Sequence, residues 1–378
     1  MKCLHLTNSQ SPGDIVMLTA AVRDLQLRHP GRFSVTLNTT ARELWDHNPY
    51  ATFAPAPRPG DRVIECCYPL IHRSNEEPWH FIHGFHQHLS ACLGLRIEPT
   101  RFQGDIHVAP EERQWVSQVE EITKMRMPFW IIAAGGKFDY TAKWWSHERY
   151  QQVVDHFDGR ILFVQVGEAC HHHPKLRGVL DLRGKTSMRQ LVRLVHHSQG
   201  VLCPVTLLMH LAAAVPASEG MPRNRPCVVI AGGREPSQWE AYPHHQFLHT
   251  CGALSCCDNG GCWKSRVVPV GDGDGKDNPE DLCTDVVHLR DASLSFRRHT
   301  EEPLPAHALP GNQHRRLTDY LPRCLDMIRS AQVIEAIERY FEGGVVSYLN
   351  DAQRAASHEA IHLSHGDQAH QPETSSVS

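Results

Sequence analysis

The stretch DLRGKTSMRQLVRLVHHSQGVLCPVTLLMHLAAAV, residues 181–215, contains a helix, a strand, a short loop and a second helix in that order. Helices fit residues 187–197 and 207–215, and the run GVLCP between them has the length of a buried strand. A helix that begins directly after a parallel strand offers free backbone N–H groups to an anion. Because Thr206 comes just before the second helix and His210 lies in its first turn, we expect a phosphate site here.

Strands and helices alternate along most of the remaining chain. Strand-like runs occupy residues 2–7, 33–37, 61–66, 128–136, 160–168 and 225–233, and further helices fit 14–29, 78–95 and 146–157. This alternation predicts an α/β fold with parallel sheets that are covered by helices on both faces. We therefore expect two Rossmann-like halves in tandem, with a ligand cleft between the carboxyl ends of their strands.

A polar helix predicted over 109–128 and ended by a proline marks the boundary between the halves. We expect an N-terminal domain at 1–125, a C-terminal domain at 126–330 with a cysteine-rich region at 251–324, a C-terminal helix at 331–350 and a tail at 351–378. The tail lacks periodic apolar residues and is predicted to be disordered.

Composition narrows the class of protein. The 378 residues are 41% hydrophobic and carry a net charge of −4, which gives no support to a nucleic-acid partner. No apolar run approaches the roughly 20 residues that span a bilayer, and the N-terminus MKCLHLTN lacks a signal-peptide layout. We therefore expect a cytoplasmic protein, in which clustered cysteines indicate metal or redox chemistry more often than disulfides.

Two turns that follow strands carry candidate catalytic residues. Gly13 and Asp14 precede the first long helix, where the carboxylate either caps the helix or faces the cleft as a general base. Gly135 ends a strand, and Lys143 follows it in a position to meet a diphosphate, although a surface lysine would look the same. Glu168 ends another strand, where an acid can accept hydrogen bonds from ribose hydroxyls.

Six of the thirteen cysteines lie between residues 251 and 324. We predict a tetrahedral metal site with four thiolate ligands, at Cys257, Cys262, Cys283 and Cys324. Cys256 competes with Cys257, because adjacent side chains rarely both reach one ion, and Cys251 is a weaker candidate. Such a site suits zinc or iron, and the alternative is a set of reduced core cysteines.

The nearby run GDGDGKDN, residues 271–278, invites a calcium interpretation but does not fit the EF-hand pattern. Lys276 stands where a third oxygen ligand belongs, so we interpret the run as a turn.

The Gly-Asp helix start, the lysine after the strand and the GKTS…MHLAAA segment together resemble glycosyltransferase family 9. The characterised members are ADP-heptose-dependent heptosyltransferases of the two-domain GT-B fold. The resemblance implies that Asp14 deprotonates the acceptor hydroxyl, Lys143 neutralises the leaving diphosphate and Glu168 holds the nucleoside. It also implies donor contacts from Gly13, Gly135, Thr206, Leu207, Met209 and His210.

One departure from the family concerns the donor sugar. The family usually has Asp-Thr-Gly-Pro before Met-His, whereas this chain has Val205-Thr206-Leu207-Leu208. The exact donor sugar therefore stays open. Two other functions stay open as well: a nucleotide-sugar epimerase or hydrolase of the GT-B fold, and a non-catalytic, metal-stapled binding protein.

The cysteine cluster resembles the iron-binding finger of the autotransporter-type heptosyltransferases within this family. The resemblance implies structural iron, with zinc as the alternative, and ADP-heptose as the donor substrate. It implies a hydroxyl acceptor on protein or lipopolysaccharide and allows a homo-oligomer.

Overall fold

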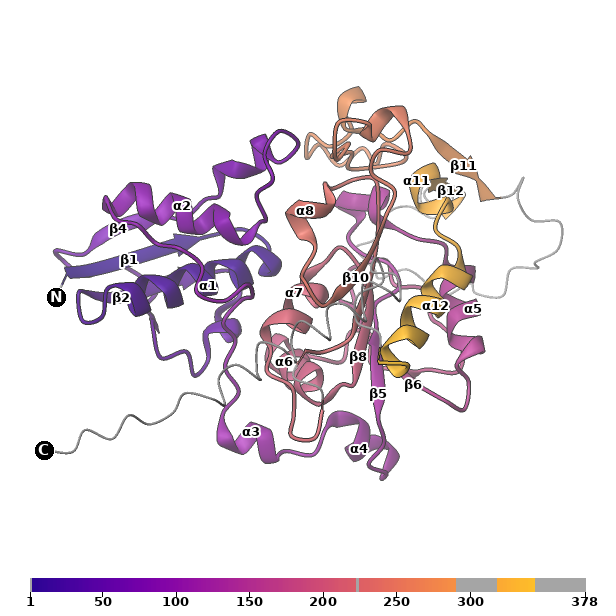
Figure 1. Cartoon of the computed structure of the whole chain (residues 1–378), viewed down its shortest axis with the longest axis horizontal. Helices are drawn as coiled ribbons and strands as arrows, with labels where there is room; N and C mark the ends of the chain where they lie inside the picture. Colours follow the sequence, from indigo (N-terminus) through magenta and orange to yellow (C-terminus); the bar gives the residue numbers. More distant parts are fainter. Residues whose placement is uncertain (1, 222–223, 290–317, 344–378) are drawn as a thin grey trace, which may run out of the picture.

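The computed structural model describes residues 2–221, 224–289 and 318–343 (Figure 1). The predicted tail at 351–378 lies outside the described residues, and so does much of the predicted cysteine-rich region, from 290 to 317. No helix in the described part of the chain is both long and apolar enough to cross a membrane.

The N-terminal half contains a four-stranded, fully parallel sheet in the order β3-β2-β1-β4. The strands are β1 (Lys2–Asn8), β2 (Phe33–Thr39), β3 (Thr52–Phe53) and β4 (Arg62–Glu65). The helices of this half are α1 (Pro12–Arg28) and α2 (Ile82–Leu93), with two short 3-10 helices at Arg42–Trp45 and Pro69–Arg73.

Both long helices of this half begin at residues other than those predicted. Helix α1 begins two residues before Asp14, because Pro12 fits the first helical position, where its missing N–H costs nothing. Helix α2 begins later than residue 78, because the preceding residues contact the other half instead. The N–H of Phe81 donates to the carbonyl of Trp239 at 2.8 Å.

The second half contains a six-stranded parallel sheet in the order β10-β9-β8-β5-β6-β7. Its strands are β5 (Phe129–Ile132), β6 (Leu162–Gln165), β7 (Leu180–Asp181), β8 (Gly200–Pro204), β9 (Cys227–Gly232) and β10 (His245–His249). Its helices are α5 (His147–His156), α6 (Met188–His197), α7 (Leu207–Ala214), α8 (Ser237–Glu240), α11 (Arg323–Asp326) and α12 (Ser330–Phe341), with a 3-10 helix at Phe138–Lys143. The predicted α/β fold with parallel sheets is therefore confirmed.

The single polar helix predicted at 109–128 is wrong. The segment forms two short helices, α3 (Pro110–Gln114) and α4 (Gln118–Thr123), because Trp115 is extended and Ser117 starts a new helix. The hydroxyl of Ser117 accepts a hydrogen bond from the backbone N–H of Glu120, which caps α4.

The two halves share one apolar core. Helix α1 of the first half packs on α7 of the second, with both helices between the two sheets (Figure 1). Ile15 and Val16 on α1 and Leu211 and Ala214 on α7 are almost fully buried in this core. The interface therefore places the first turn of α1 next to the first turn of α7.

Residues 251–289 form loops around two 3-10 helices, at Ser255–Cys257 and Pro279–Asp281, and end at β11 (Val286–His288). Strand β11 pairs antiparallel with β12 (Tyr320–Pro322). In the GDGDGKDN run, the carboxylates of Asp272, Asp274 and Asp277 all bind the fully buried guanidinium of Arg266. An arginine thus takes the place that a calcium ion would need, which agrees with a turn.

A buried ion pair holds the first half together. Arg23 and Asp24 on α1 are both fully buried, and Asp24 also accepts hydrogen bonds from Thr100 and from His86 Nε2 at 2.8 Å. Burial alone would raise the pKa of Asp24, but the bonds from His86, Arg23 and Thr100 outweigh it and hold the pKa well below its usual range. This cluster ties α1 to α2 and to the segment around residue 100.

We expect Asp24→Ala to lower the free energy of unfolding by about 3–5 kcal/mol, because it leaves Arg23 as a buried charge without its partner. Urea denaturation measures the change. Glu98→Ala is the control, since Glu98 pairs with Arg28 and Arg96 at the surface and should cost less than about 1 kcal/mol. Equal stability of the two variants would contradict the role of the cluster.

The buried pair of Arg23 and Asp24 predicts that the free energy of unfolding depends on pH. Because the pKa of Asp24 is lowered on folding, its contribution is present above the ordinary carboxyl pKa of about 3.9 and is lost as the pH falls below it. The stability difference between the wild type and Asp24→Asn should therefore shrink in acid.

Candidate active site

A cleft of about 400 Å³ opens at the carboxyl ends of the strands, where the two halves meet. Eight of the nine predicted acceptor-side and donor-side residues line it: Gly13, Asp14, Gly135, Lys143, Glu168, Thr206, Leu207 and His210. The exception is Met209, whose side chain is fully buried in the core and does not line the cleft. The prediction of a donor contact from the Met209 side chain is therefore corrected to a packing role.

Asp14 lies in the first turn of α1, after the N-cap residue Ser11. Burial raises the pKa of its carboxyl group, although a hydrogen bond from the Tyr68 side chain, a backbone N–H at Ser11 and the charge of Lys143 act in the opposite direction. Asp14 is therefore not the cap itself, but its charge favours the helix start and its side chain lines the cleft, and its role as a base stays a prediction. A raised pKa suits a carboxylate that has to accept a proton near neutral pH.

Lys143 ends the 3-10 helix at Phe138–Lys143 and forms an ion pair, with its Nζ 2.6 Å from Glu235 Oε1. Glu235 is 2% exposed and also pairs with Arg234, so one carboxylate holds two cations. Burial would raise the pKa of Glu235, but Arg234 and Lys143 outweigh it and lower the pKa. The Arg234 guanidinium lies over the Tyr140 ring at 5.0 Å. These contacts fix two positive charges at the wall of the cleft.

The start of α7 forms the neighbouring part of the wall, where Lys143 Nζ lies 3.5 Å from the carbonyl of Val205. Thr206 is the N-cap, and its hydroxyl accepts a long hydrogen bond of 3.5 Å from the N–H of Leu208. His210 lies one turn further on, with its Nδ1 2.8 Å from the hydroxyl of Tyr242. Burial, then repulsion from His245 and Lys143, lowers the pKa of His210 to about 3. His210 is therefore neutral, so it contributes a polar contact and no positive charge to a phosphate.

Several residues that line the cleft were not predicted from the sequence. Tyr68 follows β4, and Arg234 and Glu235 follow the glycine pair that ends β9, the same pattern that pointed to Gly135. That pattern could have found Arg234 and Glu235. Glu240 had no such signal. It is buried in the cleft wall, where burial and repulsion from Glu235 raise its pKa well above the usual range.

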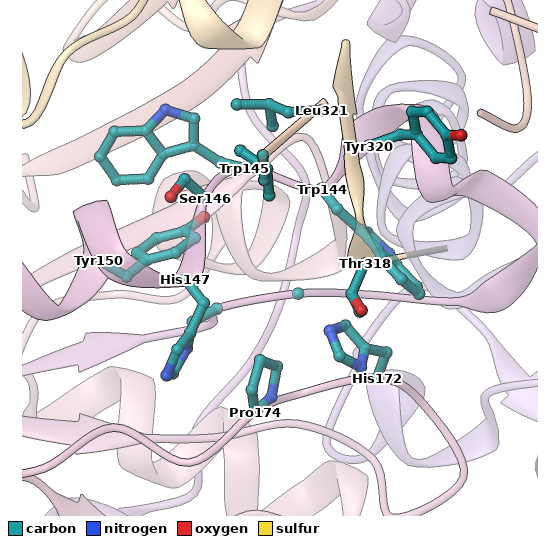
Figure 2. Close-up of a pocket in the computed structure, with 13 residues that line it drawn as sticks. Trp144, Trp145, Ser146, His147, Tyr150, His172, Pro174, Thr318, Tyr320 and Leu321 are labelled. Atoms are coloured by element: carbon teal, nitrogen blue, oxygen red, sulfur yellow. The ribbon is translucent and has the colours of Figure 1, made fainter. Parts of the chain in front are cut away.

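The loop after β6, which carries Glu168, is held in place by the contacts of His172. A small pocket of about 80 Å³ separates it from α5, and Figure 2 shows Trp144 and His172 facing one another beside this pocket. Their rings stack with centroids 4.2 Å apart. The backbones of Gly136 and His172 exchange two hydrogen bonds, of 2.8 and 3.0 Å. The glycine turn and the Glu168 loop therefore form one rigid unit.

The predicted metal ligands lie beyond β9, with Cys257 in a 3-10 helix, Cys262 and Cys283 in loops and Cys324 in α11. Cys257 and Cys324 are buried, and Cys262 and Cys283 are partly buried. Burial, then repulsion from Cys262 and Cys256, raises the pKa of Cys283 to about 12. The pKa of Cys324 is also raised to about 12, by burial and then by several thiols that include Cys283, Cys262 and Cys256. These thiols therefore lie close enough to act on one another, and thiolates are ligands that suit zinc or iron.

Cys256 and Cys257 compete for one of the four ligand positions. The Cys257 sulfur points at the carbonyl of Thr250, at 3.6 Å, and packs on Gly233. Cys256, in contrast, acts electrostatically on both Cys283 and Cys324. Cys257 acts in the same way on Cys262 and Cys251, so both cysteines lie among the other thiols. Within the described ranges, the thiols do not approach one another closely enough to form a group of three ligand atoms within 4.8 Å.

Comparisons with known proteins relate part of the chain to one family. The model of "Glycosyltransferase family 9 (heptosyltransferase)" matches residues 80–247. The comparison with curated protein sequences finds no match.

Three solved structures share the fold. The family 9 glycosyltransferase from Veillonella parvula DSM 2008 is 14% identical, with a TM-score of 0.53 over 68% of this chain and 90% of that one. TibC, an iron-containing dodecameric glycosyltransferase from enterotoxigenic E. coli H10407, is 18% identical, with a TM-score of 0.52 over 91% and 78%. TibC in complex with ADP-D-beta-D-heptose gives 17% identity and a TM-score of 0.55 over 90% and 76%. Residues 80–247 thus match the glycosyltransferase family 9 model, and the chain shares the fold of these solved structures.

Proposed function

We propose that this chain transfers heptose from ADP-heptose to a hydroxyl group, with inversion at the anomeric carbon. The observation that carries the proposal is one cleft in which a partly buried carboxyl group, Asp14, lies with two fixed cations, Lys143 and Arg234. A family 9 model described as heptosyltransferase and a similar fold solved with ADP-D-beta-D-heptose support the choice of donor.

In this proposal Asp14 removes the proton from the acceptor hydroxyl as its oxygen attacks the anomeric carbon. The bond from that carbon to the diphosphate oxygen breaks, and ADP leaves with the electron pair. Lys143, Arg234 and the N-terminus of α7 stabilise the negative charge that develops on the diphosphate. A direct displacement of this kind inverts the configuration and needs no metal ion.

The acceptor is a hydroxyl on a protein or on lipopolysaccharide, and the resemblance of the cysteine cluster to the autotransporter-type finger favours protein. We also propose a cytoplasmic homo-oligomer. The dodecameric state of TibC supports the assembly.

We further propose that Cys257, Cys262, Cys283 and Cys324 hold a structural iron ion, with zinc as the alternative metal and Cys256 as the alternative fourth ligand. The thiols that raise one another's pKa support the site, and the iron in TibC supports the metal. The metal would supply cross-links among loops that contain few buried apolar residues.

We expect Asp14→Asn to lower the rate of heptose transfer by about 10²- to 10⁴-fold, the usual contribution of a general base. ADP binding, followed by calorimetry, should persist, because the cations and α7 are untouched. The exposed Asp158→Asn is the matched control and should keep its activity. Transfer by Asp14→Asn at more than a tenth of the wild-type rate would overturn the assignment of the base.

We expect Tyr68→Phe to move the acid limb of the pH profile of kcat/KM to higher pH. The Tyr68 hydrogen bond lowers the pKa of Asp14, so its removal raises a pKa that burial has already raised. Tyr140→Phe, which removes another hydroxyl of the same cleft, should leave the limb in place. Identical limbs in wild type and Tyr68→Phe would show that another group controls activity in acid.

We expect Cys283→Ser and Cys262→Ser to lose bound iron and to lower the yield of soluble protein. Cys257→Ser should lose the metal as well, whereas Cys256→Ser should retain it. The measurement is iron and zinc per chain by emission spectrometry, with the exposed Cys3→Ser as control. A soluble, folded Cys283→Ser protein with full metal content would rule out the site.

A further inference from the structure

A second group of potential metal ligands lies at the rim of the cleft, far along the chain from the cysteine-rich region. Glu168, Cys170 and His171 each offer one ligand atom, and these three atoms lie within 4.8 Å of one another. Glu168 Oε2 is 3.5 Å from His171 Nε2 and 3.7 Å from Cys170 Sγ. Ligand atoms on a tetrahedral ion with bonds of about 2.0–2.3 Å are separated by about 3.3–3.8 Å. The spacing therefore fits one ion.

The loop that carries these residues is already held in shape. The N–H of His171 donates to the carbonyl of Glu168 at 3.1 Å, and the N–H of Gly184 donates to the carbonyl of Gly167 at 2.7 Å. Behind the loop, His172 is stacked on Trp144, as Figure 2 shows. Binding an ion would consequently order little additional backbone.

The charges around the three ligand atoms favour the binding of a cation. Lys137 acts on both Cys170 and His171, but Glu168 and Asp139 face the same group with negative charge. Lys137 also approaches the hydroxyl of Ser11 at 3.3 Å. Two carboxylates therefore offset one ammonium group before any thiolate forms.

The location links this group to the nucleotide. Glu168 and His171 line the cleft, and three protein ligands leave a fourth position of a tetrahedral ion open. We propose that Glu168, Cys170 and His171 form a site for a thiophilic divalent cation such as Zn²⁺, whose binding withdraws Glu168 from the donor nucleoside and inhibits donor binding. The thiol proton of Cys170 passes to solvent as the metal–sulfur bond forms. A thiolate ligand selects Zn²⁺ or Co²⁺ over Mg²⁺ and Ca²⁺.

The metal site stands on its own geometry, whereas the inhibition rests on the proposed function. Two measurements keep them apart. The first is titration of the iron-loaded protein with Co²⁺, read from the thiolate-to-cobalt absorption band and from metal per chain. We expect wild type and the control Cys3→Ser to bind one more Co²⁺ per chain than Cys170→Ser and Glu168→Gln. Equal binding by wild type and Cys170→Ser would overturn the site.

The second measurement is ADP affinity by calorimetry with Zn²⁺ or Mg²⁺. At a Zn²⁺ concentration ten times its dissociation constant, competition should weaken the apparent ADP affinity of the wild type about tenfold, and Mg²⁺ should not. Cys170→Ser should bind ADP as the wild type does without zinc, and its affinity should not respond to zinc beyond chelation of ADP. The same zinc response in both proteins would overturn the inhibition. Failure of the metal-free wild type to bind ADP would refute the proposed donor, while the Co²⁺ result would still decide the site.

Discussion

The cleft depends on the close approach of α1 to α7. Gly13 in the first turn of α1 faces His210 on α7, and a Cβ atom at Gly13 would lie only 3.0 Å from the imidazole Cδ2. His210 is fixed in turn by Tyr242, whose hydroxyl also lies 3.2 Å from the Met17 sulfur on α1. Because His210 and Tyr242 are buried, an alanine at position 13 would have to displace the imidazole by a few tenths of an ångström. The absence of a side chain at Gly13 therefore brings Asp14 into the same cleft as the start of α7.

Within the cleft, three carboxyl groups have three different electrostatic environments. Glu235 lies between Lys143 and Arg234, so its pKa is lowered and it remains an anion that positions both cations. Burial and repulsion from Glu235 raise the pKa of Glu240 well above the usual range, which favours its neutral form. The pKa of Asp14 is raised by burial but opposed by Tyr68 and Lys143. Asp14 is thus the carboxyl group suited to change its protonation state during turnover.

The sequence predicts the helices and strands better than it predicts the contacts between them. Apolar runs and helix periodicity locate most strands and α7, because both depend on neighbouring residues. Local patterns do not predict the side-chain directions on α7. Met209 enters the core and His210 faces α1, because of the way in which two helices that are distant in sequence pack together. Tyr68 reaches Asp14 across 54 residues of sequence, a contact that no local pattern encodes. The choice between Cys256 and Cys257 likewise depends on where the backbone near Gly233 lies.

The cysteine-rich loops contact the cleft residues through the backbone that follows β9. The N–H of Cys262 donates to the carbonyl of Gly233 at 3.2 Å, and the N–H of Trp263 donates to the carbonyl of Arg234 at 2.9 Å. Cys251 Sγ lies 3.0 Å from the carbonyl of Glu235. These bonds fix the two residues that orient Lys143. A metal ion that rigidifies the loops would therefore act on catalysis without touching the substrate, because it would hold the Arg234-Glu235 segment, and with it the positive charge for the diphosphate, in place.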